Sequence, residues 1–286
     1  MMMLSGQPVG VDPHAKPAAS FGAMLASFWR HRGVIWRMAR REVHGRYKGA
    51  AMGLAWSFIT PVLMLAVYTF VFAVIFKARW GIGGDESRAQ FAVVLFVGMI
   101  VHAVFAEVVN RAPGLIVANT NFVKRVVFPI EVLPIVAMGS ALFHALVSTL
   151  VLLVAFLLFN GYLHGTALLF PVVLLPLLVL TIGFAWLFAS LGVFVRDIGQ
   201  TTAILTTVMM FLAPVFYPVD AIPEQFRPAI MANPLTFIIG QARDVLVFGR
   251  MPDWIGLALY MAVALLIAWL GFAWFQKTRK GFADVL

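Results

Sequence analysis

The chain has 286 residues, of which 62% are hydrophobic and only 12% are charged, and its formal net charge is +9. A soluble globular domain is about 25% charged, so this composition excludes that class and predicts an all-α integral membrane protein. We expect the basic residues to contact anionic lipid headgroups or charged lipid substrates and not nucleic acid, because they lie beside apolar segments. The absence of cysteine excludes disulfides and thiolate metal sites, and we expect neither a metal nor a cofactor in this chain.

The N-terminal region is predicted to hold a disordered tail and a surface helix. The first twenty residues contain three prolines and no long apolar run, so residues 1–24 are interpreted as a tail and not as a cleaved signal peptide. Residues 25–47 predict an N-terminal amphipathic interfacial helix. Its apolar side holds Leu25, Phe28, Trp29, Ile35, Trp36, Ala39, Val43 and Tyr47, and its cationic side holds Arg30, Arg37, Arg41 and His44. A plain membrane anchor is an equally good interpretation.

Six apolar segments then predict six transmembrane helices, because about 20 residues cross the hydrocarbon core. They cover approximately 52–76, 91–109, 132–159, 166–195, 199–216 and 255–275, and the fifth is the shortest. Residues 110–129 are too polar to span and predict a cytoplasmic loop. In residues 217–249 prolines and charges alternate with short apolar patches, which predicts periplasmic re-entrant helices before the last span.

The distribution of positive charge predicts the orientation. Most of the 21 Lys and Arg residues flank the ends of the spans that this topology places in the cytoplasm. We therefore expect a multi-pass protein with both termini cytoplasmic.

Motifs of nucleotide hydrolysis and of metal- or serine-dependent catalysis are absent. The sequence contains no GxxxxGK[ST], HExxH or GxSxG, so we expect a transport subunit and not an enzyme. Three ionisable residues lie within the predicted spans. His144 is interpreted as a neutral, hydrogen-bonded helix-contact residue, Glu107 as a helix-end carboxylate near Arg111 and not a proton carrier, and no role is assigned to His102.

Aromatic residues make up 14% of the chain. Two groups lie where they could line a channel along which sugar rings stack: Tyr68, Phe72 and Phe76 in the first span, and Phe211, Phe216 and Tyr217 at the end of the fifth. Lipid-facing bulk is the simpler interpretation.

Five segments carry a family resemblance in combination: RREVHGRYKGAAMGLAWSFITP, VYTFVFAVIFKARWG, VNRAPGLIVANTNFVKRVVFPIEVLP, LGVFVRDIGQ and APVFYPVDAIPEQFRPAIMANPLT. From about Arg30 onward the chain resembles the membrane subunit of ABC-2 type polysaccharide exporters, and most closely the O-antigen polysaccharide permease. The resemblance implies an assembly of two such permeases with two cytoplasmic P-loop ATPase subunits that bind ATP and Mg. It also implies transport of a polysaccharide on undecaprenyl diphosphate across the bacterial inner membrane.

The same resemblance implies roles for individual residues. The ATPase would dock on Trp29, Arg30, Arg37, Asn121, Lys124 and Arg125. The lipid diphosphate would bind Arg40, Arg41, Arg46 and Lys48, although these cations could equally set topology and contact anionic lipids. Arg196 and Asp197 would form an inner gate or simply end a helix, and residues 217–249 would form the outer gate.

Three alternatives stay open. A capsule or teichoic-acid exporter permease would have the same architecture. A membrane-embedded polyprenyl-phosphate glycan transferase would share the basic membrane surface but needs clustered cytoplasmic carboxylates, of which the sequence offers few. A secondary flippase is disfavoured by the scarcity of charge within the spans.

Overall fold

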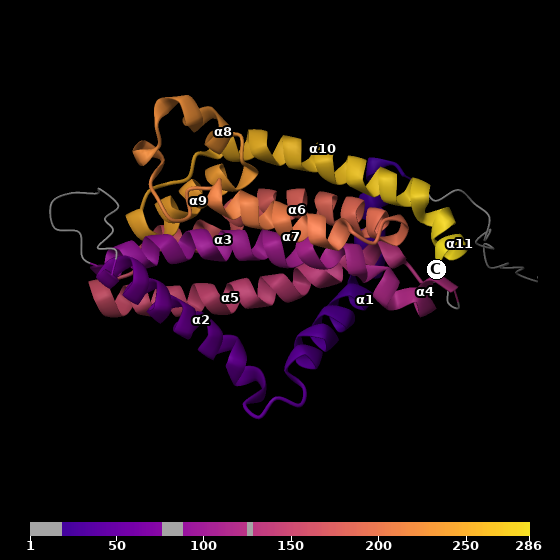
Figure 1. Cartoon of the computed structure of the whole chain (residues 1–286), viewed down its shortest axis with the longest axis horizontal. Helices are drawn as coiled ribbons and strands as arrows, with labels where there is room; N and C mark the ends of the chain where they lie inside the picture. The colour runs from indigo at the N-terminus through magenta and orange to yellow at the C-terminus, as the bar shows by residue number, and fades with distance from the viewer. Residues whose placement is uncertain (1–18, 76–87, 125–127) are drawn as a thin grey trace, which may run out of the picture.

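The computed structural model describes residues 19–75, 88–124 and 128–286, and within these ranges the chain is helical with no strand. Figure 1 shows most of the long helices running side by side along the longest axis, whereas the two indigo helices near the N-terminus slant away from them. The helices are α1 (Phe21–Tyr47), α2 (Trp56–Tyr68), α3 (Arg88–Leu115), α4 (Thr120–Lys124), α5 (Leu133–Asn160), α6 (Phe170–Phe194), α7 (Ile198–Phe211), α8 (Arg227–Met231), α9 (Pro234–Arg243), α10 (Trp254–Thr278) and α11 (Phe282–Val285).

Helix α3 forms the centre of the bundle. It packs against α5, α6, α7 and α9, and 78% of its most apolar stretch is buried inside the protein. The run Phe91–Val97 is buried on every side, as expected for a helix that is apolar all round. Helix α2 is the opposite case, because only 11% of its apolar stretch is buried.

Helices α6 and α10 approach each other most closely through small residues. A Cβ atom added to Gly271 would lie 2.2 Å from the carbonyl oxygen of Gly183, and one added to Gly183 would lie 2.8 Å from the backbone of Ala268. Small residues at such positions let two backbones meet, which is a common way of packing helices within membranes.

Five of the described helical segments are long and apolar enough to cross a membrane. They are Gly53–Phe72, Phe91–Leu115, Ile130–Asn160, Gly165–Phe194 and Trp254–Val285. The predicted span 199–216 corresponds to α7, an apolar helix of 14 residues and therefore about 21 Å long. A sixth crossing stays a prediction.

Two helix boundaries differ from those predicted. Helix α1 begins at Phe21, inside the predicted tail, because the Ser20 hydroxyl accepts a hydrogen bond from the Ala23 amide and caps the helix. Residues 1–18 of that tail lie outside the described ranges. Helix α3 continues through Pro113 to Leu115, so the predicted loop 110–129 begins in helix. Gly192 of α6 makes room there, because a Cβ atom would lie 2.3 Å from the Pro113 carbonyl oxygen.

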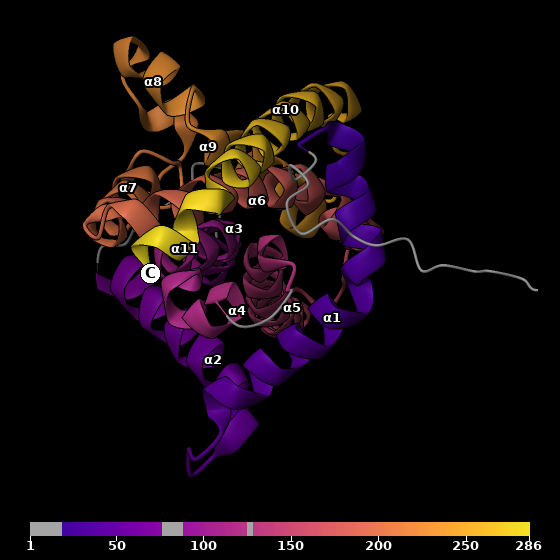
Figure 2. The same cartoon turned by 90° about the vertical axis from the view of Figure 1, so that its right-hand side faces the viewer.

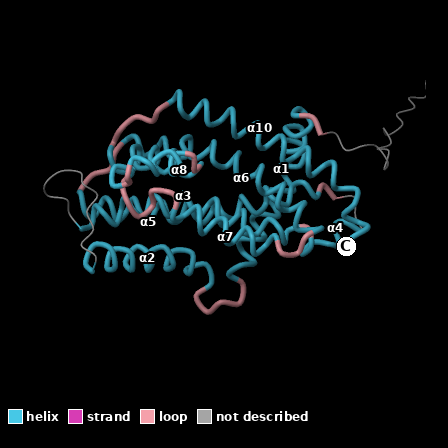
Figure 3. Tube along the Cα trace, turned by 45° about the horizontal axis from the view of Figure 1, so that its top comes forward, coloured by secondary structure: helices cyan, strands magenta, loops and turns pink. Residues whose placement is uncertain are grey.

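The predicted gate region 217–249 has two parts. Its first part holds short 3-10 turns and α8, which stands away from the bundle in Figures 1 and 2. In Figure 3, where the top of Figure 1 has come forward, α8 lies over the other helices. Its second part, α9 followed by the π-helical turn Asp244–Phe248, is buried against α3 and α6. A re-entrant path through the membrane stays a prediction for both.

Candidate functional site

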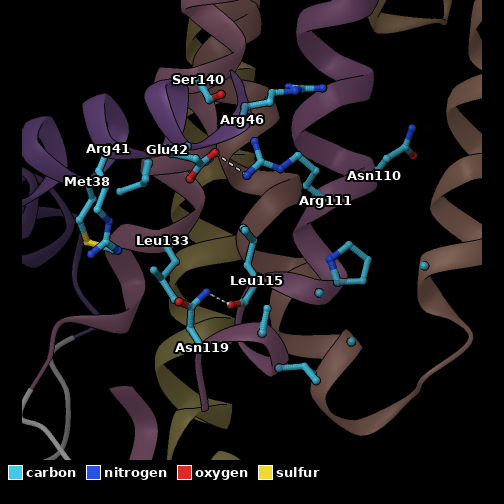
Figure 4. Close-up of a pocket in the computed structure, with 18 of the residues that line it drawn as sticks. Met38, Arg41, Glu42, Arg46, Asn110, Arg111, Leu115, Asn119, Leu133 and Ser140 are labelled. Carbon is cyan, nitrogen blue, oxygen red and sulfur yellow. Dashed lines mark hydrogen bonds and ion pairs between the residues drawn. The ribbon is translucent and has the colours of Figure 1, made fainter. Parts of the chain in front are cut away.

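A cavity of about 1020 Å³ opens at the end of the bundle where α1, α3, α5 and α6 meet (Figure 4). We call it the basic cavity. Among the residues that the structure describes, four arginines line it, and Glu42 is the one lining carboxylate. The cationic lining residues are Arg41, Arg46, Arg111 and Arg196. This excess of positive charge favours an anionic ligand.

The packing of α1 on α5 determines which of its side chains face the cavity. Ala39 and Val43 are buried, and Ala39 lies so close to α5 that a Cβ atom on Gly139 would be 2.9 Å from its methyl group. With this face against α5, Glu42 and Arg46, one helical turn apart, line the cavity and pair with residues of α3.

An ion-pair network joins α1, α3 and α5 beside the cavity. Arg46 Nη1 donates to Glu107 Oε1 at 2.6 Å, and His144 Nδ1 lies 2.9 Å from Glu107 Oε2. Arg111 pairs with Glu42, as Figure 4 shows, and its second nitrogen lies 3.7 Å from Glu107. Glu107 lies near Arg111, as predicted, but it is within α3 and not at its end, because the helix continues to Leu115. His144 is hydrogen-bonded, as predicted, and its neutral state stays a prediction.

Polar groups without partners also line the cavity. Within the described ranges Arg41 and Arg196 make no hydrogen bond or ion pair, so both guanidinium groups are available to a ligand. Ser140 is fully buried, and its hydroxyl has no hydrogen-bond partner among the described residues. Buried hydroxyls are usually hydrogen-bonded, so Ser140 could donate to a group bound in this cavity.

The four cationic side chains predicted to bind the lipid diphosphate do not all lie at one site. Arg41 and Arg46 line the basic cavity. Arg40 instead lies with Arg37 and His44 along a shallow outer depression that Arg41 also reaches, and Lys48 is exposed at the end of α1. The division follows from helical geometry, since residues 40 and 46 are six positions apart and face different directions.

The sequence interpretation missed Arg111, Asn110, Asn119 and Ser140 as cavity residues. The spacing of Glu107 and Arg111, four residues apart on one helix, was the available signal for a charged site on α3. Ser140 and Asn119 gave no such signal, because their role depends on α3, α5 and α6 meeting.

The predicted gate residues also separate. Arg196 lines the cavity, while Asp197 precedes α7 and forms no ion pair with Arg196 in the described part of the chain. Among the predicted docking residues, Trp29, Arg30, Arg37 and Asn121 are exposed. Lys124 ends α4, its side chain is not described, and Arg125 lies outside the described ranges.

The residues predicted to form the apolar side of α1 differ in their burial. Ala39 and Val43 are buried, but Trp29 is 73% exposed and Trp36 is 71% exposed. The guanidinium of Arg32 stacks over the Trp29 ring at 4.7 Å. Exposed tryptophans beside arginines suit a membrane interface, and the interfacial placement of α1 stays a prediction.

The two predicted groups of channel aromatics come together in space. Phe72 lies 5.5 Å from Phe216 in a stacked arrangement, and Tyr68 and Phe211 extend this pair on either side at 6.5 and 5.8 Å between ring centroids. The Tyr217 hydroxyl donates to the Phe211 carbonyl at 2.6 Å. Phe76 lies outside the described ranges. We call these five residues the aromatic cluster.

Comparison with known proteins identifies the family. Residues 33–247 match the model of the family described as ABC-2 type transporter. The chain belongs to the ABC-2 type transporter family. The matched residues begin within α1 and continue through α9, so they contain the whole lining of the basic cavity and all five residues of the aromatic cluster.

Relatives of this ABC-2 type chain align over almost their whole length. The O-antigen export system permease protein RfbA of Myxococcus xanthus is 26% identical over 263 residues, which are 91% of this chain and 98% of the relative. A Klebsiella pneumoniae protein of the same name is 25% identical over 252 residues, 87% and 93% of the two chains. The polysialic acid transport protein KpsM of Escherichia coli is 24% identical over 242 residues, 84% and 91% of the two chains. These similarities confirm the family resemblance seen in the sequence.

Proposed function

We propose that this ABC-2 chain is the membrane subunit of an ATP-driven exporter that moves an O-antigen-type polysaccharide, carried on undecaprenyl diphosphate, from the cytoplasm to the periplasm. The names of the relatives support the polysaccharide, and the basic cavity supports an anionic carrier lipid. The observation that carries the proposal is that Arg41 and Arg196, from different segments, line one cavity with no ion-pair partner among the described residues.

Arginine is suited to the diphosphate. Its planar guanidinium donates two parallel hydrogen bonds to phosphate oxygens, and such charge-assisted bonds are about twice as strong as neutral ones. Arg41 and Arg196 would bind the diphosphate first, because Arg46 and Arg111 are already paired with Glu107 and Glu42. Ser140 would add a neutral donor at the closed end of the site.

We further propose that two copies form the glycan channel. A single chain has too few helices to enclose a hydrated sugar polymer, and α2 leaves most of its apolar surface uncovered. The aromatic cluster would lie along this channel, where ring faces stack on sugars without fixing one register.

The energy would come from a partner. Two P-loop ATPase subunits would bind ATP and Mg and dock on the exposed residues of α1 and on the segment that contains α4. In this proposal the chain lies in the bacterial inner membrane and has both termini in the cytoplasm.

The test is a charge removal at the cavity. The chain is purified in nanodiscs with the P-loop ATPase that co-purifies with it, and undecaprenyl diphosphate binding is measured by native mass spectrometry. Arg41→Ala with Arg196→Ala should weaken binding by at least tenfold and reduce surface glycan in cells. Arg250→Ala, which removes an exposed charge away from the cavity, should do neither. Unchanged binding and export in the arginine variant would refute the proposed site.

A capsule polysaccharide is the second candidate substrate, because two relatives are polysialic acid transport proteins. Deletion of the chain distinguishes the two. Loss of the lipopolysaccharide side chain supports the first substrate, and loss of capsule with intact lipopolysaccharide supports the second.

A further inference from the structure

Glu131 lies at a junction of four segments that are far apart in the sequence. It belongs to the 3-10 turn Ile130–Val132, between the loop 110–129 and α5, and it is only 7% exposed. Its carboxylate accepts a hydrogen bond from Ser27 of α1 at 3.2 Å and another from Arg279, just after α10, at 2.9 Å. Its backbone carbonyl accepts from the indole nitrogen of Trp186 in α6 at 2.9 Å.

Aromatic packing encloses this junction. The Phe28 ring stacks on Trp186 with 5.6 Å between centroids, and Trp186 meets Phe272 of α10 edge to face at 5.1 Å. Trp186 itself is fully buried. The Glu131 side chain is only 9% exposed, although that of its partner Arg279 is 30% exposed. Hydrogen bonds to a carboxylate buried in this way are stronger and more costly to break than they would be at the surface.

The C-terminal segment is attached at the same place. Arg279 also donates to the Phe128 carbonyl at 3.2 Å, so one guanidinium binds both Glu131 and the end of the loop. Phe282 of α11 is fully buried against Phe275 and Phe194, and α11 packs beside α4. Figures 1 and 2 both show α11 and α4 adjacent.

The segments joined at Glu131 either carry a surface on which the ATPase is proposed to dock or pack beside one. Ser27 is two residues from Trp29 on α1, Phe128 ends the loop that contains α4, and α11 lies against α4. The packing of α1 on α5 is largely apolar and has little directionality, whereas the Ser27 and Arg279 hydrogen bonds fix distance and angle.

We propose that Glu131 is a positioning residue that makes the start of α1, the end of the loop 110–129 and the C-terminal segment move as one unit when the ATPase closes. The inference rests on the proposed function. Glu131 touches neither substrate nor nucleotide. It acts by keeping the start of α1, the end of the loop and the C-terminal segment in fixed relation, so that displacement of one displaces the others together with α6.

The first test measures coupling. In nanodiscs that contain the chain and its co-purified P-loop ATPase, the rate of ATP hydrolysis is compared with glycan export in cells that carry the same variant. Glu131→Gln should retain at least half of the hydrolysis per assembled complex and lower export at least fivefold. Ser27→Ala, which removes the hydrogen bond from α1 to Glu131, should lower the amount of glycan exported per ATP by a smaller factor than Glu131→Gln does. Arg279→Lys should partly preserve coupling, because the lysine keeps one charged donor.

The second test measures motion. The chain has no cysteine, so spin labels can be placed specifically at Ala26→Cys on α1 and Ala283→Cys on α11. Both positions are exposed. The distance between the labels should stay constant when ATP is added to the wild-type complex and should become broadly distributed in Glu131→Gln.

The control is Thr181→Val, which removes a buried hydroxyl of α6 that bonds only to its own helix, at the Leu177 carbonyl. It should alter neither coupling nor distance. If Glu131→Gln lowers hydrolysis and export in proportion to the amount of assembled complex, or changes neither, the inference is overturned while the proposed function stands. If no P-loop ATPase binds the wild-type chain, the proposed function fails and the inference fails with it.

Discussion

Arg46 of α1 and Glu107 of α3 form an ion pair of 2.6 Å beside a cavity, and this pair is a main link between the two helices. Helix α1 packs along α5, whereas it reaches α3 through the side chains of Arg46 and Glu42. Ion pairs can exchange partners in a way that close packing cannot. An anionic headgroup in the basic cavity would compete with Glu107 for Arg46, and α1 could then separate from α3 without exposing a packed core.

Arg46→Gln, which leaves Glu107 with its His144 and Arg111 contacts, should therefore loosen the end of α1 with little effect on global stability. The Arg46 side chain is 52% exposed, and such pairs contribute about 1 kcal/mol or less. We expect the Tm in detergent to fall by about 2–4 °C or less, since 1 kcal/mol corresponds to about that shift in chains of this size. Export should change several-fold. A large loss of Tm without a specific effect on export would show that the pair is mainly structural.

Gly183→Leu or Gly271→Val should prevent α6 and α10 from packing. The added side chains would meet backbone atoms at 2.2–2.9 Å, and backbone cannot move aside as a flexible side chain can. Overpacking of this kind costs about 1–3 kcal/mol or more, so we expect lower Tm and less protein in the membrane fraction. Gly240→Ala is the matched control, because its helical site has no atom within 4 Å of the new methyl group. It should be neutral or slightly stabilising.

Arg243→Lys should destabilise the end of the bundle opposite the basic cavity. The buried Arg243 side chain donates from Nε to the Val94 carbonyl at 3.0 Å and from Nη2 to the Val215 carbonyl at 3.1 Å. A lysine has one nitrogen and cannot reproduce this fork, and a buried acceptor left without its donor costs about 1–3 kcal/mol. Thermal unfolding checks the expected loss. Arg250→Lys, at a side chain that is 71% exposed, should have no measurable effect.

Phe72→Ala combined with Phe216→Ala should slow export, if the aromatic cluster guides the glycan. The two rings stack at 5.5 Å, and each aromatic contact is worth about 0.5–1.5 kcal/mol, or roughly a threefold to tenfold change in binding. Surface glycan in cells gives the readout. Phe159→Ala, on the exposed side of α5, tests whether loss of any lipid-exposed ring has the same effect. Equal losses in both variants would refute a channel role for the cluster.

The sequence predicted the helical class and the family, since composition, apolar run length and motif order carry that information locally. The sequence analysis placed Phe72 and Phe216 in two separate aromatic groups and did not predict that they contact each other. Their separation in sequence hides the contact, and no spacing rule connects them.

The basic cavity was predicted less well. Arg40 and Arg46 look alike in the sequence, and only the face of α1 that packs on α5 decides which of them lines the cavity. The Glu131 junction was not foreseen, because Arg279 is 148 positions away and a lone carboxylate at a loop end gives no local signal of its partner.

The close approach of Gly183 to Gly271 has a mechanical consequence. Two helices in backbone contact cannot slide without collision, so α6 and α10 form a fixed frame for any transport cycle. Helix α2 buries only 11% of its apolar stretch against its own chain, so packing restrains its position less than that of α6 or α10. A glycan channel bounded by α2 could therefore widen for a thicker polysaccharide, while α6 and α10 keep the same relative position throughout the transport cycle.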